Sequence, residues 1–409
     1  MKLFVDNSTK VSVLLTICLI AYNYVDGPVS FAIASAFLLL NITKDNYKMT
    51  EIKFLFPVFL ICFIGIIAGL LQKSTLTDYL RDIYYFVQPI VYIYTGYYIC
   101  KKYDSKYDLF FNIVFVAWIL SIFYLIRVMQ NPSVILQSSD ITDIRNEVGK
   151  ETVIQMVAVI LITTQRVNVK RNKILLYAPI VVVFLLQFSR ASIGTISIYY
   201  LIYFIHNREK FSKKTFRMVF CAFIIIIAFV MLLPEALITD LVSRFAKSLS
   251  EVSSGVTTDW NVDTAYQHWR GYEIHIVLEE FNTSNLIQQL FGYGFGHRVQ
   301  LGSGITLLGM SSIPVFHNGY IQVLSKAGII GLLLLIIFYL RIYKYADRYK
   351  LTNDYEVRNL AKCIMAYTIG ILFYSYVKSG IFRGSSILEY CLLVGIFVAK
   401  ASKLKKTED

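Results

Sequence analysis

His317 is the first side chain in the sequence that is suited to catalysis. It stands directly before Asn318, at the start of a long apolar stretch that runs to Leu340. A neutral imidazole can accept a proton near pH 7, so His317 could act as a general base or orient a hydroxyl group. A histidine at a helix start can also simply hydrogen-bond a loop carbonyl, while Asn318 caps the helix. Both interpretations fit the sequence.

Arg190 is a second candidate, in the segment FSRAS between two apolar stretches at 174–188 and 190–206. A cation at the rim of a membrane is costly unless it meets an anion or polar partners. The planar guanidinium matches phosphate oxygens, which makes Arg190 a candidate phosphate clamp. The alternative is an arginine whose head reaches the membrane interface while its stem lies among apolar groups.

Arg270 lies in QHWRGYEIH, together with Trp269 and Glu273. One expectation is a solvated helix face on which Arg270 pairs with Glu273 at spacing i, i+3. The other is that Arg270 and Arg190 together bind a pyrophosphate. Such a site would need no metal, in agreement with the lack of a DxD-type acidic cluster in the sequence. We expect no cofactor.

A glycine-rich segment, GYGFGHR, follows Arg270 at 292–298. Gly292, Gly294 and Gly296 permit positive φ and a close approach of the backbone. Their spacing is not that of the dinucleotide-binding fingerprint, and no βαβ pattern surrounds them, so we expect a structural turn that aims the loop at a cavity. Further candidates for substrate contact near this turn and near His317 are His297, Arg298, Trp269, Asn318 and Tyr320. Weaker candidates are Arg145, Arg244, Lys378 and Arg383, and the aromatic residues Trp260 and Tyr293.

The composition is that of a polytopic membrane protein. Of 409 residues, 56% are hydrophobic and only 16% are charged, whereas soluble proteins carry about a quarter charged residues. Several apolar runs approach the ~20 residues that cross a bilayer. The first run, 11–22, has no small-residue cleavage signal and is expected to be a retained helix. The six cysteines form no CxxC and fall within or beside apolar runs, so we expect buried apolar fillers.

The fold class that follows is an all-α membrane protein with about twelve transmembrane helices. The expected spans are 11–25, 28–42, 54–71, 83–100, 109–128, 151–165, 174–188, 190–206, 217–233, 317–340, 361–378 and 386–399. No internal repeat of the kind found in many transporters is evident. Gly328 and Gly331 follow His317 in the tenth span. At 100° per residue, Gly328 returns to within about 20° of His317, so we expect a small-residue face that another helix or a lipid can approach.

The distribution of basic residues predicts the orientation. If the N-terminus is cytoplasmic, 27 of the 40 Lys and Arg lie in cytoplasmic segments, as the positive-inside rule requires. The formal charge of +13 is therefore an orientation signal, and no nucleic-acid partner is expected. Both termini are predicted to be cytoplasmic.

Two long segments are then predicted to lie outside, at 129–150 and 234–316. The second predicts a division of the chain into helices 1–233, an extracytoplasmic loop 234–316, and helices with a cytoplasmic tail at 317–409. Loops of this length are usually functional. We expect an amphipathic helix at Tyr266–Phe281 within it, with Ile274, Val277, Leu278 and Phe281 on its apolar side.

Three motifs occur in a fixed order: FSRAS, then WRGYEIH with the GYGFG turn, then HN-x9-GxxG. In this order they resemble the bacterial O-antigen polymerase and O-antigen ligase family, over roughly residues 150–340. The HN-x9-GxxG spacing is the most specific of the three motifs.

The resemblance implies a metal-independent, inverting, GT-C-like glycosyltransferase of the bacterial cytoplasmic membrane, with its active site outside. It implies that Arg190 and Arg270 bind the pyrophosphate of an undecaprenyl-pyrophosphate-linked oligosaccharide, and that His317 activates the acceptor. The lipid bilayer, a chain-length regulator and a flippase would be the partners.

Polymerases are the more numerous and divergent branch of the family, so polymerase is the function we expect. The alternatives are a ligase that transfers the glycan to lipid A core, a flippase for the same lipid-linked glycan, and a non-catalytic assembly scaffold.

Overall fold

The structure is a computed structural model of the 409-residue chain. The residues that it describes are 13–21, 27–44, 52–72, 74–103, 109–133, 141–147, 153–165, 167, 173–187, 189–207, 235, 237–239, 242–243, 260–302, 305–306, 309–383 and 387–408.

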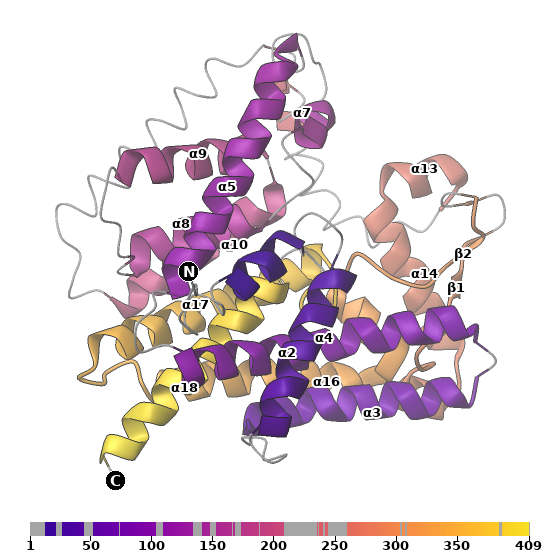
Figure 1. The fold of residues 1–409 in the computed structure, drawn as a ribbon. Helices are drawn as coiled ribbons and strands as arrows, with labels where there is room; N and C mark the ends of the chain where they lie inside the picture. The colour runs from indigo at the N-terminus through magenta and orange to yellow at the C-terminus, as the bar shows by residue number, and fades with distance from the viewer. Residues whose placement is uncertain are drawn as a thin grey trace, which may run out of the picture.

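The described part of the chain is almost entirely helical, in agreement with the predicted all-α class (Figure 1). Residues 13–21 form a short helix. The remaining helices are α2 (Pro28–Lys44), the 3-10 helix η1 (Lys53–Leu55), α3 (Phe56–Leu70), α4 (Leu76–Tyr103), α5 (Leu109–Gln130), α7 (Ile141–Glu147), α8 (Ile154–Thr164), α9 (Lys173–Leu186), α10 (Arg190–His206), α13 (Val262–Gln267), α14 (Trp269–Thr283), α15 (Leu286–Phe291), α16 (Gly319–Asp347), α17 (Tyr355–Val377) and α18 (Ile387–Glu408). Strands β1 (Val299–Gln300) and β2 (Ser312–Ile313) form one short antiparallel pair.

Four described helical segments are long and apolar enough to cross a membrane: Lys53–Leu70, Leu109–Gln130, Gly319–Asp347 and Tyr355–Val377. They coincide with four of the expected spans. Shorter apolar helices, α2, α8 and α9, lie where further spans are expected. The expected span 217–233 lies outside the described residues. The chain is thus an all-α protein with membrane-spanning helices, and the number twelve stays a prediction.

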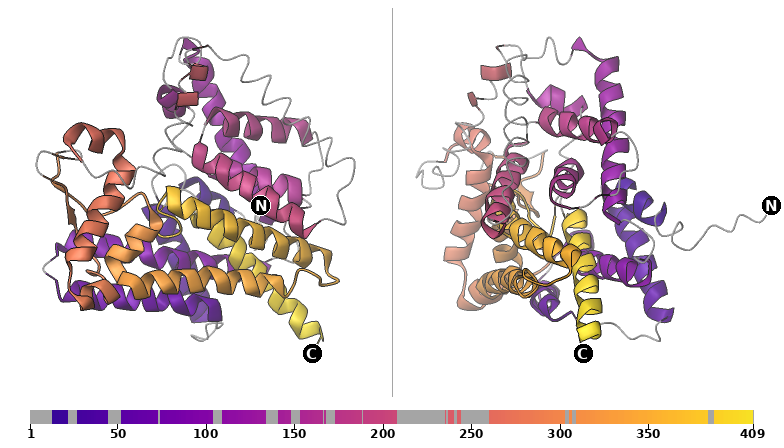
Figure 2. Two further views of the ribbon diagram at one scale, coloured as in Figure 1. Left: turned by 180° about the vertical axis from the view of Figure 1, so that it is seen from behind. Right: turned by 90° about the vertical axis from the view of Figure 1, so that its left-hand side faces the viewer.

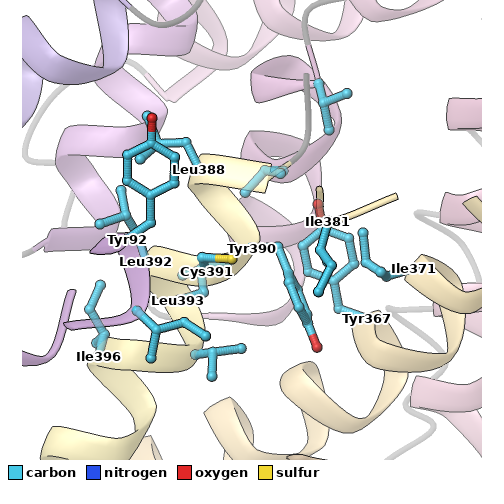
Figure 3. Close-up of a cluster of buried hydrophobic side chains, with 14 of the residues drawn as sticks. Tyr92, Tyr367, Ile371, Ile381, Leu388, Tyr390, Cys391, Leu392, Leu393 and Ile396 are labelled. Carbon is cyan, nitrogen blue, oxygen red and sulfur yellow. The ribbon is translucent and has the colours of Figure 1, made fainter. Parts of the chain in front are cut away.

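The core forms where α18 packs along α4. An added Cβ at Gly395 of α18 would lie 2.1 Å from the backbone oxygen of Ile93, so glycine is what permits this close approach. Figure 3 shows the buried side chains beside this contact, with Tyr92 from α4, Tyr367 and Ile371 from α17, and Cys391 and its neighbours from α18.

The cysteines behave as predicted in the part of the chain that is described. The five described cysteines are buried and free, and Cys221 lies outside the described residues. They fill space in the apolar core and form no disulfide with one another.

The ends of the packed helices, and the segments that connect them, meet at two ends of the molecule. At one end the His206 ring meets the Tyr343 hydroxyl at 3.3 Å, and Lys362 donates to the side-chain oxygen of Asn207 at 2.8 Å. At the other end the backbone N–H of Gly319 donates to the oxygen of Lys378 at 3.0 Å. Segments predicted to be cytoplasmic thus meet at the first end, and segments predicted to be outside meet at the second. Which end faces the cytoplasm stays a prediction.

The segment from α13 to β2, which we call the loop unit, lies at the second end, at the right of Figure 1 and at the left of the rear view in Figure 2. It has its own apolar core, to which α14 contributes Tyr272, Ile276 and Val277 and the strands contribute Val299 and Ile313. The predicted boundaries of this unit, 234 and 316, stay predictions.

The expected helix at Tyr266–Phe281 is present but divided. Helix α13 ends before His268, and α14 begins at Trp269. The buried face of α14 holds Glu273 and Ile276 together with Val277, whereas Leu278 is 39% exposed. The predicted apolar face was therefore wrong in part, because Leu278 is exposed and the buried face includes the carboxylate of Glu273.

Candidate active site

The backbone around His317 is held from both sides. The N–H of Phe316 donates to the side-chain oxygen of Gln322 at 2.8 Å, and the Ser379 hydroxyl donates to the oxygen of Phe316 at 2.7 Å. Asn318 caps α16, accepting the N–H groups of residues 320 and 321 at 2.9 and 3.2 Å. His317 therefore sits at a fixed junction between the loop unit and α16.

The His317 ring is bound to the carboxylate of Glu273. Its Nδ1 atom lies 2.9 Å from Oε1 and 3.1 Å from Oε2 of Glu273, and its backbone N–H donates to Oε2 at 3.0 Å. The indole of Trp269 donates to Oε1 at 2.7 Å. A buried carboxylate needs such donors, since an unpaired one is very costly. The Glu273 side chain is 1% exposed and that of His317 is 48% exposed.

This pairing decides which ring nitrogen of His317 can act as a base. An ionised carboxylate only accepts hydrogen bonds, so Nδ1 must carry the proton that it donates to Glu273. In the neutral ring Nε2 then has the free lone pair. No described residue forms a hydrogen bond with Nε2, and the ring is half-exposed. An acceptor at Nε2 backed by a carboxylate at Nδ1 is an arrangement that can take a proton from a hydroxyl.

Arg270 lies one helical turn before Glu273 on α14, and its side chain is half-buried. The predicted ion pair between Arg270 and Glu273 is not present; that prediction was wrong because Glu273 pairs with His317. No ion pair joins Arg270 to any described residue. Arg270 stands on the turn before Glu273, on a neighbouring face of α14 that lies about 60° away around the helix axis.

Arg190 is the first residue of α10, directly after the N-cap Ser189. Helix α10 runs antiparallel to α17: Gly194 packs on the ring of Phe373 and Thr195 on Gly370. This packing carries Arg190 towards the C-terminal end of α17, where Lys378 meets Gly319. Arg190 and His317 therefore lie at the same end of these helices, and whether they share one pocket stays a prediction.

The predicted contact residues Asn318, Tyr320 and Trp269 all have intramolecular partners. Asn318 uses its side-chain oxygen as the helix cap, which is one of the two expected interpretations. The Tyr320 hydroxyl donates to the oxygen of Leu372 at 2.8 Å. Trp269 donates to Glu273 and stacks on Tyr266 at 6.2 Å. Their roles in substrate binding stay predictions, while their visible role is to position His317 and its surroundings.

The GYGFG segment forms the structural turn that the sequence predicts, with φ of 77°, 83° and 85° at its three glycines. The turn is inserted between α3 and α16. An added Cβ at Gly294 would lie 2.0 Å from the backbone nitrogen of Gly69. Phe295 is fully buried and packs on Phe86 at 4.8 Å. The turn thus anchors the loop unit to the transmembrane helices.

Gly328 corrects another expectation. Its φ of 66° and ψ of −164° interrupt α16, and His317 precedes the helix, so a helical repeat cannot place both on one face. An added Cβ at Gly328 would lie 2.4 Å from the backbone of Leu290. The close neighbour at this glycine is therefore the C-terminal end of α15, directly before the GYGFG turn, and not one of the described membrane-spanning helices.

His297 and Arg298, two further predicted contact residues, tie the loop together. The His297 ring lies 3.0 Å from a carboxylate oxygen of Glu280 and stacks on Tyr293 at 4.3 Å. Arg298 donates to the backbone oxygen of Ser312 at 2.9 Å and pairs with Asp78 at 3.3 Å. Their part in substrate binding stays a prediction. Of the weaker candidates, Arg383 lies over a tyrosine ring and Arg244 is outside the described residues.

A buried network of charges lies behind this loop. Asp82 and Lys326 are both 0% exposed and are joined at 2.8 Å. Asp82 also accepts from Arg81 at 3.1 Å and from the backbone N–H of Gly296 at 2.8 Å. Lys326 further donates to the backbone oxygen of His297. The network joins α4, α16 and the loop unit.

Sequence reasoning missed both the role of Glu273 and this network. The signals were present: TDYLRD places two carboxylates and an arginine at the start of an apolar helix, and Lys326 is a lone charge in an apolar stretch. Ionisable residues in such places are expected to have partners or functions.

Comparison with known proteins adds no family assignment: no protein-family model matches the chain. No curated protein matches it either.

Proposed function

We propose that this protein is a surface-polysaccharide polymerase that joins undecaprenyl-pyrophosphate-linked repeat units at the outer face of a bacterial cytoplasmic membrane. The observation that carries the proposal is the His317–Glu273 pair, in which a buried carboxylate fixes the proton on Nδ1 and leaves Nε2 available. The order of the motifs around Arg190, Arg270 and His317, which resembles the O-antigen polymerase and ligase family, supports it.

In the proposed reaction, Nε2 of His317 takes the proton from a hydroxyl group of the acceptor sugar. The hydroxyl oxygen attacks the anomeric carbon of the donor and forms the new glycosidic bond. The bond between that carbon and the pyrophosphate oxygen breaks, and its electron pair leaves with undecaprenyl pyrophosphate. Direct displacement inverts the anomeric carbon. Glu273 stabilises the imidazolium that forms, as an adjacent carboxylate does in other acid–base pairs.

The two arginines act on the leaving group. Arg270 is on α14, three residues before Glu273, and Arg190 begins α10. Each guanidinium can offer two parallel N–H donors to phosphate oxygens. Held in a partly dry site, they would stabilise the negative charge that grows on the pyrophosphate as the bond breaks. We propose that no metal ion takes part.

A ligase would use the same donor and the same base and would differ in its acceptor, lipid A core. A flippase or a scaffold would form no new glycosidic bond. The test therefore uses purified protein in lipid nanodiscs with lipid-linked repeat units, with and without lipid A core, and without ATP or an ion gradient. We expect longer lipid-linked chains. Transfer to lipid A core alone would identify a ligase. If neither longer lipid-linked chains nor glycosylated lipid A core formed, the result would contradict an enzymatic function.

Three variants sharpen this test. His317→Ala should lower the rate by about 10²–10⁴-fold, the usual contribution of a general base. Arg190→Ala and Arg270→Ala should abolish polymer while the protein still reaches the membrane, and lysine should replace either arginine poorly because it lacks the planar fork. Arg348→Ala, an exposed arginine at the opposite end of α16, is the matched control and should leave the rate unchanged. Normal polymer from Arg190→Ala or Arg270→Ala would exclude the arginine clamp.

A further inference from the structure

The loop unit contains a cavity of about 620 Å³ between α14 and β1. This volume is within the ~300–1,000 Å³ that is usual for small-molecule sites. Its wall on α14 consists of side chains at helical spacing, at positions 272, 275, 276, 279, 280 and 283. Glu273 and Arg270 are not among its lining residues. The cavity is therefore distinct from the His317 site, although both use α14.

Aromatic rings form one wall of the cavity. Trp260 lies 5.7 Å from the ring of His275, nearly parallel to it, and 5.4 Å from the ring of Tyr272. The indole N–H of Trp260 is buried and has no hydrogen-bond partner among the described residues. A flat aromatic surface suits a sugar ring, which has an apolar C–H face.

Polar side chains without positive charge complete the wall. Gln300 has an amide group that both donates and accepts hydrogen bonds, as a hydroxyl-rich ligand requires, and Asn261, whose side-chain oxygen caps α13, has its NH2 group left to donate. Glu279 and Glu280 add carboxylates, and no lysine or arginine is among the described residues that line the cavity. A pyrophosphate would meet repulsion here, whereas a neutral sugar or an amino sugar would not.

The two sites on α14 therefore differ in charge in a way that matches the two parts of one substrate. Arg270 stands one turn before Glu273 on α14, and carboxylates with aromatic rings stand at the cavity. Six residues separate Glu273 from Glu279, which is about 9 Å along the helix axis and is within reach of an oligosaccharide attached to a pyrophosphate at the His317 site.

We propose that the cavity is a glycan subsite, which holds neutral or amino sugars of the lipid-linked oligosaccharide while its pyrophosphate stays at the arginines. This inference rests on the proposed function, since it assigns the substrate of that function to two places. It makes Trp260 and Gln300 determinants of glycan binding.

Calorimetry on the full chain in nanodiscs separates the two places. One probe is the oligosaccharide released by mild acid from the lipid-linked repeat units, and the other is inorganic pyrophosphate. Trp260→Ala and Gln300→Ala should each weaken oligosaccharide binding at least tenfold and leave pyrophosphate binding unchanged. Arg270→Ala should weaken pyrophosphate binding at least tenfold and leave oligosaccharide binding unchanged. Gln267→Ala is the matched control, because Gln267 is exposed on α13 and does not line the cavity.

The inference fails if wild-type protein does not bind the oligosaccharide, or if Gln300→Ala and Trp260→Ala bind it within twofold of wild type. Gln300 is exposed, so its replacement should not unfold the loop and keeps the test decisive if Trp260→Ala is unstable. Polymer formation without oligosaccharide binding would leave the proposed function standing and remove the subsite. Oligosaccharide binding without polymer or ligation product would leave the subsite standing and contradict the proposed function.

Discussion

Two buried carboxylates at the same end of the molecule, Glu273 and Asp82, have very different partners. Glu273 is 1% exposed and supports a histidine that is half-exposed. Asp82 is 0% exposed and is paired with a lysine that is also 0% exposed. The first carboxylate holds a titratable ring at the surface with one nitrogen available. The second lies in a closed network.

The difference indicates separate roles. Asp82 accepts from a lysine, an arginine and a backbone N–H, and Lys326 also donates to the oxygen of His297, so the network anchors the loop unit to α4 and α16. The Glu273 pair leaves Nε2 of His317 without a described partner, which is what a proton acceptor needs. The closed pair is structural, and we propose that the open pair is catalytic.

Breaking the closed pair should have the largest effect on stability. Lys326→Met leaves Asp82 buried without its main counter-charge, and loss of one partner of a buried pair typically costs about 3–5 kcal/mol. We expect the free energy of unfolding in detergent to fall by about this amount. The double replacement Lys326→Met with Asp82→Leu should recover much of the loss, because neither charge is then left alone.

The exposed pair Lys350–Asp347 is the control for this experiment. Its atoms lie 2.6 Å apart, but its side chains are 35% and 40% exposed, so Lys350→Ala should cost about 0–1 kcal/mol. If Lys326→Met cost no more than Lys350→Ala, the Asp82–Lys326 pair would not be the anchor of the loop unit.

A smaller, pH-dependent effect is expected at Asp78, which precedes the predicted span 83–100. Burial raises the pKa of Asp78, but hydrogen bonds from Thr75 and Arg81, the Arg81 charge and Arg298 outweigh burial and lower it overall. A carboxyl with a lowered pKa stabilises the folded state above its ordinary pKa of about 3.9, and the contribution is lost as the pH falls through the lowered value.

Asp78→Asn should therefore reduce the free energy of unfolding at pH 7 by about 1.5–3 kcal/mol, the usual contribution of hydrogen bonds to a charged group. The difference between variant and wild type should shrink below about pH 4. Unfolding curves in detergent at pH 7 and at pH 3.5 measure it. An equal difference at both pH values would show that the charge of Asp78 does not stabilise the loop contact.

Much of the fold could be predicted from the sequence, because length and apolar composition decide where helices form in a membrane protein. The stretches 54–71, 109–128 and 361–378 fall on observed helices for this reason. The helix start at Asn318 and the positive φ of the GYGFG glycines were predictable too, since both follow from the local chemistry of a single residue type.

The site was predictable only in part. Its histidine and arginines stand out as residue types, but the partner of His317 is 44 positions away in the sequence, and no local pattern gives that distance. Glu273 was assigned to a solvated face because Arg270 is three residues before it. Gly328 was placed on the face of His317 because a regular helix was assumed, and tertiary packing against residue 290 overrides that regularity.

The turnover of Glu273→Gln tests the central claim most directly. Glutamine keeps the size of Glu273 but replaces one acceptor oxygen with an NH2 group, which can donate to Nδ1 of His317, and it lacks the charge that stabilises the imidazolium. With purified lipid-linked repeat units, we predict that kcat falls at least tenfold while KM for the donor stays unchanged and the protein remains folded at the assay temperature, as a thermal unfolding curve checks. A kcat within twofold of wild type would contradict the account in which Glu273 prepares His317 as the base.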